Sequence, residues 1–292
     1  MTVNVKKVAT FVGLTYGLAY LFAALYFAEG GTMKPPGLFV LLLVYMFIPM
    51  TSAIIVQKLV YRAPLKKPLR IAFRPNRWFL VAWVLPVLIA LATLGVSLLF
   101  PGVTLSPGKK DLFEDFLLTP DRLGIHTHRF WVGFCLALLQ GPVTGITFLG
   151  ILAFGGEVGW RGFLQRELGA LGFWKASAII GLTWGFWYAP LIPRGLNYPL
   201  HPWAGVFVMT AMTVLLAPLL GYMTIKADSV VAAALFMGTF NGAAAVLATY
   251  GVQGGNDLLM GMSGLAGLIV LLIANVGLAV FDRETTRSSC RR

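Results

Sequence analysis

Glu157 and Arg161 are the pair of charged residues in this sequence best placed to do chemistry. They stand four residues apart in FGGEVGWRGFLQRELGAL, residues 154–171, at the end of an apolar run that starts near Trp131. On a helix this spacing puts both side chains on one face, so the carboxylate and the guanidinium can pair. A carboxylate at the edge of a membrane segment is costly unless it is paired or lines a polar cavity. The pair therefore indicates either a salt bridge that orients two helices or part of a functional site.

Two later stretches add aromatic and polar side chains. WGFWYAP, residues 184–190, places Trp184 and Tyr188 at the crowded aromatic end of an apolar run. Asn241, in FMGTFNGAA, is the one strongly polar side chain in the middle of another apolar run. An asparagine at such a position often only joins helices, and such hydrogen bonds average about 0.6 kcal/mol in one system. Asn241 is thus a candidate either for structural support or for a site.

The elements that must position these residues are apolar helices. The 292 residues are 58% hydrophobic and 12% charged, with a mean hydropathy of +0.81. About a quarter of a soluble domain is charged, and a bilayer-spanning helix needs about 20 apolar residues. The sequence predicts an all-α, polytopic transmembrane helix bundle of about eight spans. The expected spans are 8–28, 37–60, 78–100, 131–154, 175–193, 203–225, 229–250 and 257–281.

The net charge of +12 is distributed in a way that argues against nucleic-acid binding. With eight spans and a cytoplasmic N-terminus, seventeen basic and five acidic residues fall on the cytoplasmic side, and six of each fall on the other. This asymmetry predicts that both termini are cytoplasmic. The surplus positive charge then faces anionic membrane lipids rather than a polynucleotide. We expect an integral protein of a prokaryotic plasma membrane.

Smaller features complete the predicted arrangement. Residues 109–118 have the spacing of a short amphipathic helix on the non-cytoplasmic surface. His126 and His128 are too few for a zinc site, which needs three or four ligands, and no cofactor or metal is expected. Gly141–Pro142 predicts a kink in the fourth span. Ser229 is a plausible N-cap of the seventh.

Three segments together resemble the CPBP family of intramembrane proteases, which includes the CAAX prenyl endopeptidases and bacteriocin-processing proteins. GEVGWRGFL resembles the family motif EExGWRGFL, with Glu157 on the second glutamate, Trp160 on the tryptophan and Arg161 on the arginine. The segment WGFWYAP, with Trp184, is similar to the second motif, an aromatic residue four positions before a histidine. The segment MGTFN is similar to the last motif, a histidine four positions before an asparagine, with Asn241 on the asparagine.

The departures from the family pattern fall on its chemistry. The resemblance implies a general base at the first glutamate, where this chain has Gly156. It also implies two histidines, which correspond to Tyr188 and Met237. A general base must take a proton near the working pH, which glycine and methionine cannot do and a phenol does poorly. The fourth position of this chemistry is the asparagine of the last motif, and it is the only one of the four that this chain keeps, as Asn241. The chain also keeps four supporting residues: Glu157, Trp160, Arg161 and Trp184.

These observations leave three hypotheses. The favoured one is a catalytically degenerate protease, a pseudoenzyme that binds a membrane-embedded or prenylated protein partner. The second is an active endopeptidase in which Glu157 acts as the base, and the third is a small transporter. The expected units are residues 1–130, with three spans and the outer amphipathic loop; 131–250, the protease-like core of spans four to seven; and 251–292, span eight and a basic cytoplasmic tail.

Overall fold

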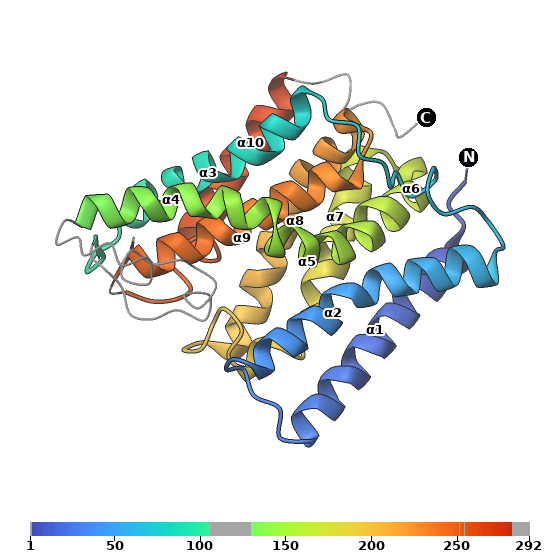
Figure 1. The fold of residues 1–292 in the computed structure, drawn as a ribbon, viewed down its shortest axis with the longest axis horizontal. Helices are drawn as coiled ribbons and strands as arrows, with labels where there is room; N and C mark the ends of the chain where they lie inside the picture. The colour runs from blue at the N-terminus through green and yellow to red at the C-terminus, as the bar shows by residue number, and fades with distance from the viewer. Residues whose placement is uncertain (1, 106–129, 251, 254, 282–292) are drawn as a thin grey trace.

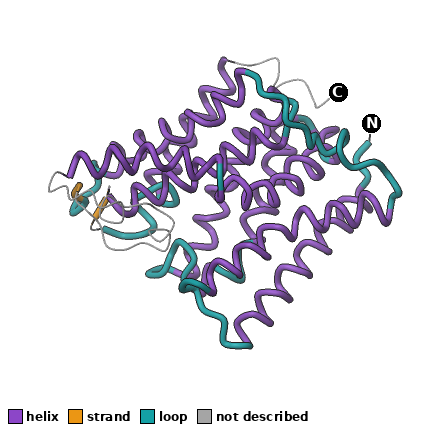
Figure 2. The backbone as a smooth tube through the Cα atoms, in the orientation of Figure 1, coloured by secondary structure: helices purple, strands orange, loops and turns teal. Residues whose placement is uncertain are grey.

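The chain is built almost entirely of helices, with one short strand pair (Figure 2). The computed structural model describes residues 2–105, 130–250, 252–253 and 255–281. The α-helices are α1 (Val5–Ala28), α2 (Gly37–Ile54), α3 (Arg77–Ser97), α4 (Phe130–Ile146), α5 (Phe148–Glu157), α6 (Gln165–Glu167), α7 (Phe173–Trp187), α8 (Pro202–Ala227), α9 (Val230–Tyr250) and α10 (Leu265–Phe281). Two π-helical segments, Ile55–Val60 and Val158–Leu164, extend α2 and α5, and two 3-10 turns cover Gly169–Leu171 and Ile192–Arg194. Strand β1 (Thr104–Leu105) pairs antiparallel with β2 (Val252–Gln253).

Helix α9 lies at the centre of the bundle, where it packs against α3, α4, α5 and α8 (Figure 1). Its approach to α4 depends on small residues. A Cβ atom on Gly242 would lie 2.6 Å from the carbonyl oxygen of Gly141, and one on Gly141 would lie 3.1 Å from the backbone nitrogen of Ala243. Small residues at helix contacts are typical of membrane bundles, in which packing rather than hydrophobic exclusion holds helices together. The Ser229 hydroxyl accepts from the Val231 amide at 3.1 Å, which confirms the predicted N-cap of α9.

One end of the bundle gathers the basic segments (Figure 1). Lys7 at the start of α1 donates to Gln57 at 2.9 Å and to Glu167 at 3.0 Å, which joins α1 to the end of α2 and to α6. The loop between α2 and α3 reaches the same end, because the Asn76 amide donates to the carbonyl oxygen of Ala227 at 3.2 Å. We call this the basic end of the bundle.

The opposite end is closed by contacts between two loops. The Tyr198 hydroxyl, from the loop between α7 and α8, donates to the carbonyl oxygen of Ser263 at 2.6 Å. His201 Nδ1 lies 2.5 Å from Asp257 Oδ1, so the same loop is joined a second time to the segment between α9 and α10.

The described helices are those of an integral membrane protein. Among the described residues, five helices are long and apolar enough to cross a bilayer: α1, α2 with its π-helical extension, α3, α8 and α9. Helices α4 and α5 with its continuation become a sixth if the bent pair is taken as one span. Helix α10, with 17 residues, is apolar but shorter, and α7 has 15. The all-α membrane bundle is confirmed, while the count of eight spans and the side of the termini stay predictions.

The expected kink at Gly141–Pro142 is wrong in its position. Helix α4 continues through Pro142 to Ile146, and the break falls at Thr147, where the axis bends by 53°. The Thr144 hydroxyl donates to the Gly141 carbonyl at 2.8 Å, and the Thr147 hydroxyl donates to the Val143 carbonyl at 3.0 Å. Hydrogen bonds of this kind, from a threonine hydroxyl to a carbonyl three or four residues earlier, often bend helices.

The eighth predicted span, residues 257–281, begins too early. The structure begins α10 at Leu265 rather than at residue 257, because positive φ angles at Gly255 and Gly261 keep the preceding segment irregular. The amphipathic helix predicted over 109–118 and the two histidines at 126 and 128 lie outside the described residues.

Candidate functional site

Local packing forces the stretch around Glu157 to face the inside of the bundle. Helix α5 ends at Glu157, and the chain continues as the π-helical segment Val158–Leu164. Two glycines let α2 pack closely against this stretch. A Cβ atom on Gly155 would lie 2.6 Å from the carbonyl oxygen of Met46, and one on Gly159 would lie 2.5 Å from Cβ of Pro49. Wide π-helical turns often occur at functional sites, and this one carries the charged pair.

Glu157 and Arg161 form the predicted pair. Arg161 Nη1 donates to Glu157 Oε1 at 3.1 Å, and the two side chains are 1% and 2% exposed for Arg161 and Glu157 respectively. The guanidinium also lies over the ring of Trp184, 4.5 Å from its centroid, a cation–π contact that is strong when both groups are shielded from water. The pair is therefore fixed between α5 and α7 and is inaccessible to bulk solvent.

The pair leaves much of its hydrogen-bonding capacity unused. Within the described part of the chain, Glu157 Oε2 and the Nε and Nη2 atoms of Arg161 have no hydrogen-bond partner. The indole nitrogens of Trp160 and Trp187 also have no partner there. The rings of these two residues pack edge to face, with their centroids 5.7 Å apart. Because buried polar atoms are nearly always paired, a cluster of unpaired ones is unusual for a purely structural salt bridge.

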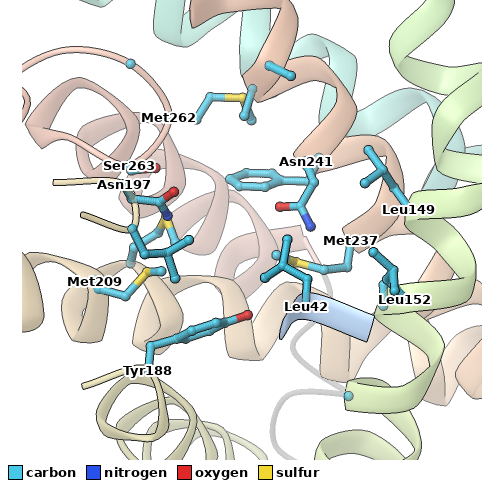
Figure 3. A pocket seen from close by; sticks show the side chains of 18 of the residues that line it. Leu42, Leu149, Leu152, Tyr188, Asn197, Met209, Met237, Asn241, Met262 and Ser263 are labelled. Carbon is cyan, nitrogen blue, oxygen red and sulfur yellow. The ribbon is translucent and has the colours of Figure 1, made fainter. Parts of the chain in front are cut away.

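A cavity of about 320 Å³ lies against this cluster. Its lining includes all four positions that correspond to the chemistry of the resembled family: Gly156, Tyr188, Met237 and Asn241. The Tyr188 hydroxyl and the Asn241 amide point into it from opposite sides (Figure 3). Residues far apart in the sequence are thus brought together by the packing of α5, α7 and α9.

The remaining predicted site residues lie beside these four. Glu157, Trp160 and Trp184 also line the cavity, whereas Arg161 is reached only through Glu157 and Trp184. Tyr188 is buried, and its hydroxyl lies 3.7 Å from the sulfur of Met46. Beside these positions the cavity has the amide of Asn241, the phenol of Tyr188 and the carboxylate of Glu157, and none of the described lining residues is a histidine.

Sequence reasoning missed part of the lining. The walls include methionines from α2, α8 and α9 and from the segment before α10, and the cavity reaches Asn197, Asp257 and Ser263 at the end of the bundle opposite the basic end. Methionines within apolar runs give no local signal, because core positions have the same pattern. Asp257 could have been suspected as an acidic residue next to an apolar run, but its partner His201 is 56 residues away.

Gly156 differs from the neighbouring glycines in having free space beside it. A Cβ atom on Gly156 would meet nothing closer than the Trp160 side chain, at 3.6 Å, which is ordinary van der Waals contact. On Gly155 the same atom would collide with backbone of α2. The missing side chain at position 156 is therefore not required by packing.

This difference predicts opposite effects of two adjacent substitutions. Gly156→Ala is expected to keep or raise the free energy of unfolding, because alanine favours a helix over glycine by about 0.5–1 kcal/mol. Gly155→Ala is expected to lower it by about 1–3 kcal/mol through overpacking against α2. Reversible unfolding of both variants in mixed micelles measures the difference. Equal losses in the two variants would show that position 156 is packed as tightly as position 155.

The fold and the cavity together define an integral membrane protein whose helices enclose a site with a buried charged pair. The family model described as type II CAAX prenyl endopeptidase Rce1-like matches residues 140–243. The matched residues run from α4 into α9 and include all three motifs, so this part of the chain is similar to the CAAX-protease family. Among curated proteins, none matches the chain.

Proposed function

We propose that this protein is a catalytically degenerate member of the CAAX-protease family, which holds a membrane-embedded or prenylated peptide in its cavity without cleaving it. The observation that carries the proposal is the open space at Gly156. A general base must come within about 2.6–3.2 Å of the proton that it removes, and position 156 has no side chain to do so. Its location is proposed to be a prokaryotic plasma membrane, with the basic end of the bundle on the cytoplasmic side.

The other two replaced positions support the same conclusion. Met237 and Tyr188 line the cavity where the resemblance implies histidines. A thioether takes up no proton at neutral pH, and a phenol has a reference pKa of about 10. Each substitution removes a proton-transfer group while keeping an apolar or aromatic wall, which suits a binding role.

One observation favours a second candidate, an endopeptidase that uses Glu157 as its base. Glu157 lines the same cavity, and its Oε2 atom has no partner among the described residues. Its Oε1 atom is already engaged by Arg161 at 3.1 Å, so only Oε2 could accept a proton from an attacking water. An assay of the purified protein distinguishes the two candidates.

We expect the protein in liposomes to bind farnesylated CAAX peptides and transmembrane peptides but to release no cleavage product above the rate without protein. Binding is followed by fluorescence of a labelled peptide, and cleavage is followed by mass spectrometry. The Glu157→Gln variant is measured in parallel, because glutamine keeps the shape of the side chain but cannot act as a base. Turnover that disappears in Glu157→Gln would contradict the proposal and establish Glu157 as the catalytic base.

A further inference from the structure

The inner end of the cavity presents polar atoms that lack partners. Glu157 Oε2 is an acceptor, and the indole nitrogens of Trp160 and Trp187 are donors; all three residues are at least nine-tenths buried and line the cavity. The Trp160 nitrogen lies 3.6 Å from the place of a Cβ atom on Gly156, so it borders the open space at that position. We call these three residues the polar floor. A carboxylate oxygen can only accept and an indole N–H can only donate, so together they favour a group that both donates and accepts.

Most of the other lining residues are apolar, and many of them are flexible. Six of the ten methionines of the chain line this cavity: Met46, Met209, Met212, Met237, Met260 and Met262. Methionine is unbranched and flexible, so it adjusts its shape to different apolar partners. The lining residues of α9 run from Met237 to Ala248, which is about 16 Å at 1.5 Å per residue. The apolar lining residues along this stretch suit contact with an extended hydrocarbon chain.

The charges at the floor argue for an uncharged head group. Glu157 is already paired with Arg161, so the floor is close to neutral as a whole. A charged head group would lose its hydration and find no unpaired countercharge there, which is costly. A neutral group with an N–H or O–H beside a carbonyl oxygen could donate to Glu157 Oε2 and accept from the Trp160 indole. A primary amide has this pattern, and so does a carboxylic acid in its neutral form.

We propose that the cavity binds a single-chain amphiphile with a neutral donor–acceptor head group, of which a fatty primary amide is the simplest form, with the head on the polar floor and the chain between the methionines. The proposal rests on the non-hydrolytic binding role proposed above. Such a ligand has no peptide bond between two residues, so its binding can be measured without any cleavage.

The test compares compounds that differ only in the head group. Thermal unfolding of the protein in lipid nanodiscs is measured with dodecanamide and with methyl dodecanoate, which accepts but cannot donate, at equal mole fractions in the bilayer. A ligand that binds the folded state raises the unfolding temperature in proportion to its occupancy. We expect dodecanamide to bind about ten-fold more tightly than the ester, because only the amide pairs the buried carboxylate oxygen. Dodecanoic acid at acidic and neutral pH tests whether the neutral acid binds as the amide does.

Variants assign the preference to the polar floor. Trp160→Phe keeps the aromatic packing but removes the indole N–H, and it is expected to reduce dodecanamide affinity several-fold. Trp203→Phe is the matched control, since the Trp203 side chain is exposed and does not line the cavity. Equal affinities of the parent protein for amide and ester, or no shift with any compound, would overturn the proposal whether or not Trp160→Phe folds. Cleavage of peptides would overturn the proposed function alone, because binding of these compounds is measured without turnover.

Discussion

The triple variant Gly156→Glu, Tyr188→His, Met237→His is expected to hydrolyse farnesylated CAAX peptides that the parent protein leaves intact. The reason is the size of the catalytic deficit in the parent. Asn241 can supply one oxyanion donor, and one such donor contributes about 2.7–4 kcal/mol. Enzymatic rate enhancements commonly correspond to about 8–23 kcal/mol. A base and two imidazoles in the same cavity would supply groups of the kind that are missing.

The geometry of position 156 admits a glutamate side chain without rebuilding the fold. A Cβ atom there meets only ordinary contacts, and positions 188 and 237 already line the cavity. Product formation is measured by mass spectrometry over time in liposomes.

A second triple variant and a double variant serve as controls. The first control carries glutamine instead of glutamate at position 156. Glutamine adds the same volume but cannot act as a base, so this variant should be inactive. The double variant Tyr188→His, Met237→His without a residue 156 side chain should be inactive as well. A triple variant that folds, binds the peptide and still shows no turnover would mean that the loss of activity does not reside at these three positions.

Arg161→Ala is expected to lower the free energy of unfolding by about 3–5 kcal/mol, because it leaves a buried carboxylate without its partner. Both side chains of the pair are at most 2% exposed, so solvent screens them little. The substitution also removes the cation–π contact with Trp184 at 4.5 Å. Unfolding in mixed micelles, followed by tryptophan fluorescence, measures the loss.

A double variant separates the unpaired charge from the lost packing. Glu157→Gln with Arg161→Met removes both charges and keeps much of the volume, and replacing a buried ion pair in this way is often neutral. It should therefore recover most of the stability lost in Arg161→Ala. Arg74→Ala, at an exposed position, should change the free energy of unfolding by less than about 0.5 kcal/mol. A stable Arg161→Ala protein would show that the pair contributes little to folding.

The sequence by itself determined the class of structure and the local pair. Apolar runs of about 20 residues can be satisfied in a bilayer only as helices, so the all-α membrane bundle follows from composition and length. The pairing of Glu157 with Arg161 follows from their spacing, since residues four apart meet on one face of a helix. The motif order also predicted a resemblance to the CAAX-protease family, and the family-model match over residues 140–243 supports that resemblance.

Only the tertiary structure decided which side chains share the cavity. Gly155, Gly156 and Gly159 look alike in the sequence, yet only Gly156 faces open space, because the packing of α2 occupies the other two positions. The methionine walls and Asp257 come from elements distant in the chain, so no local pattern reveals them. The break at Thr147 rather than at Pro142 likewise depends on threonine hydroxyls that donate to preceding carbonyls and on the close approach of α9. Helix formation is governed by local hydrogen bonds and apolar periodicity, whereas the shape of a cavity depends on contacts between helices that are far apart in sequence.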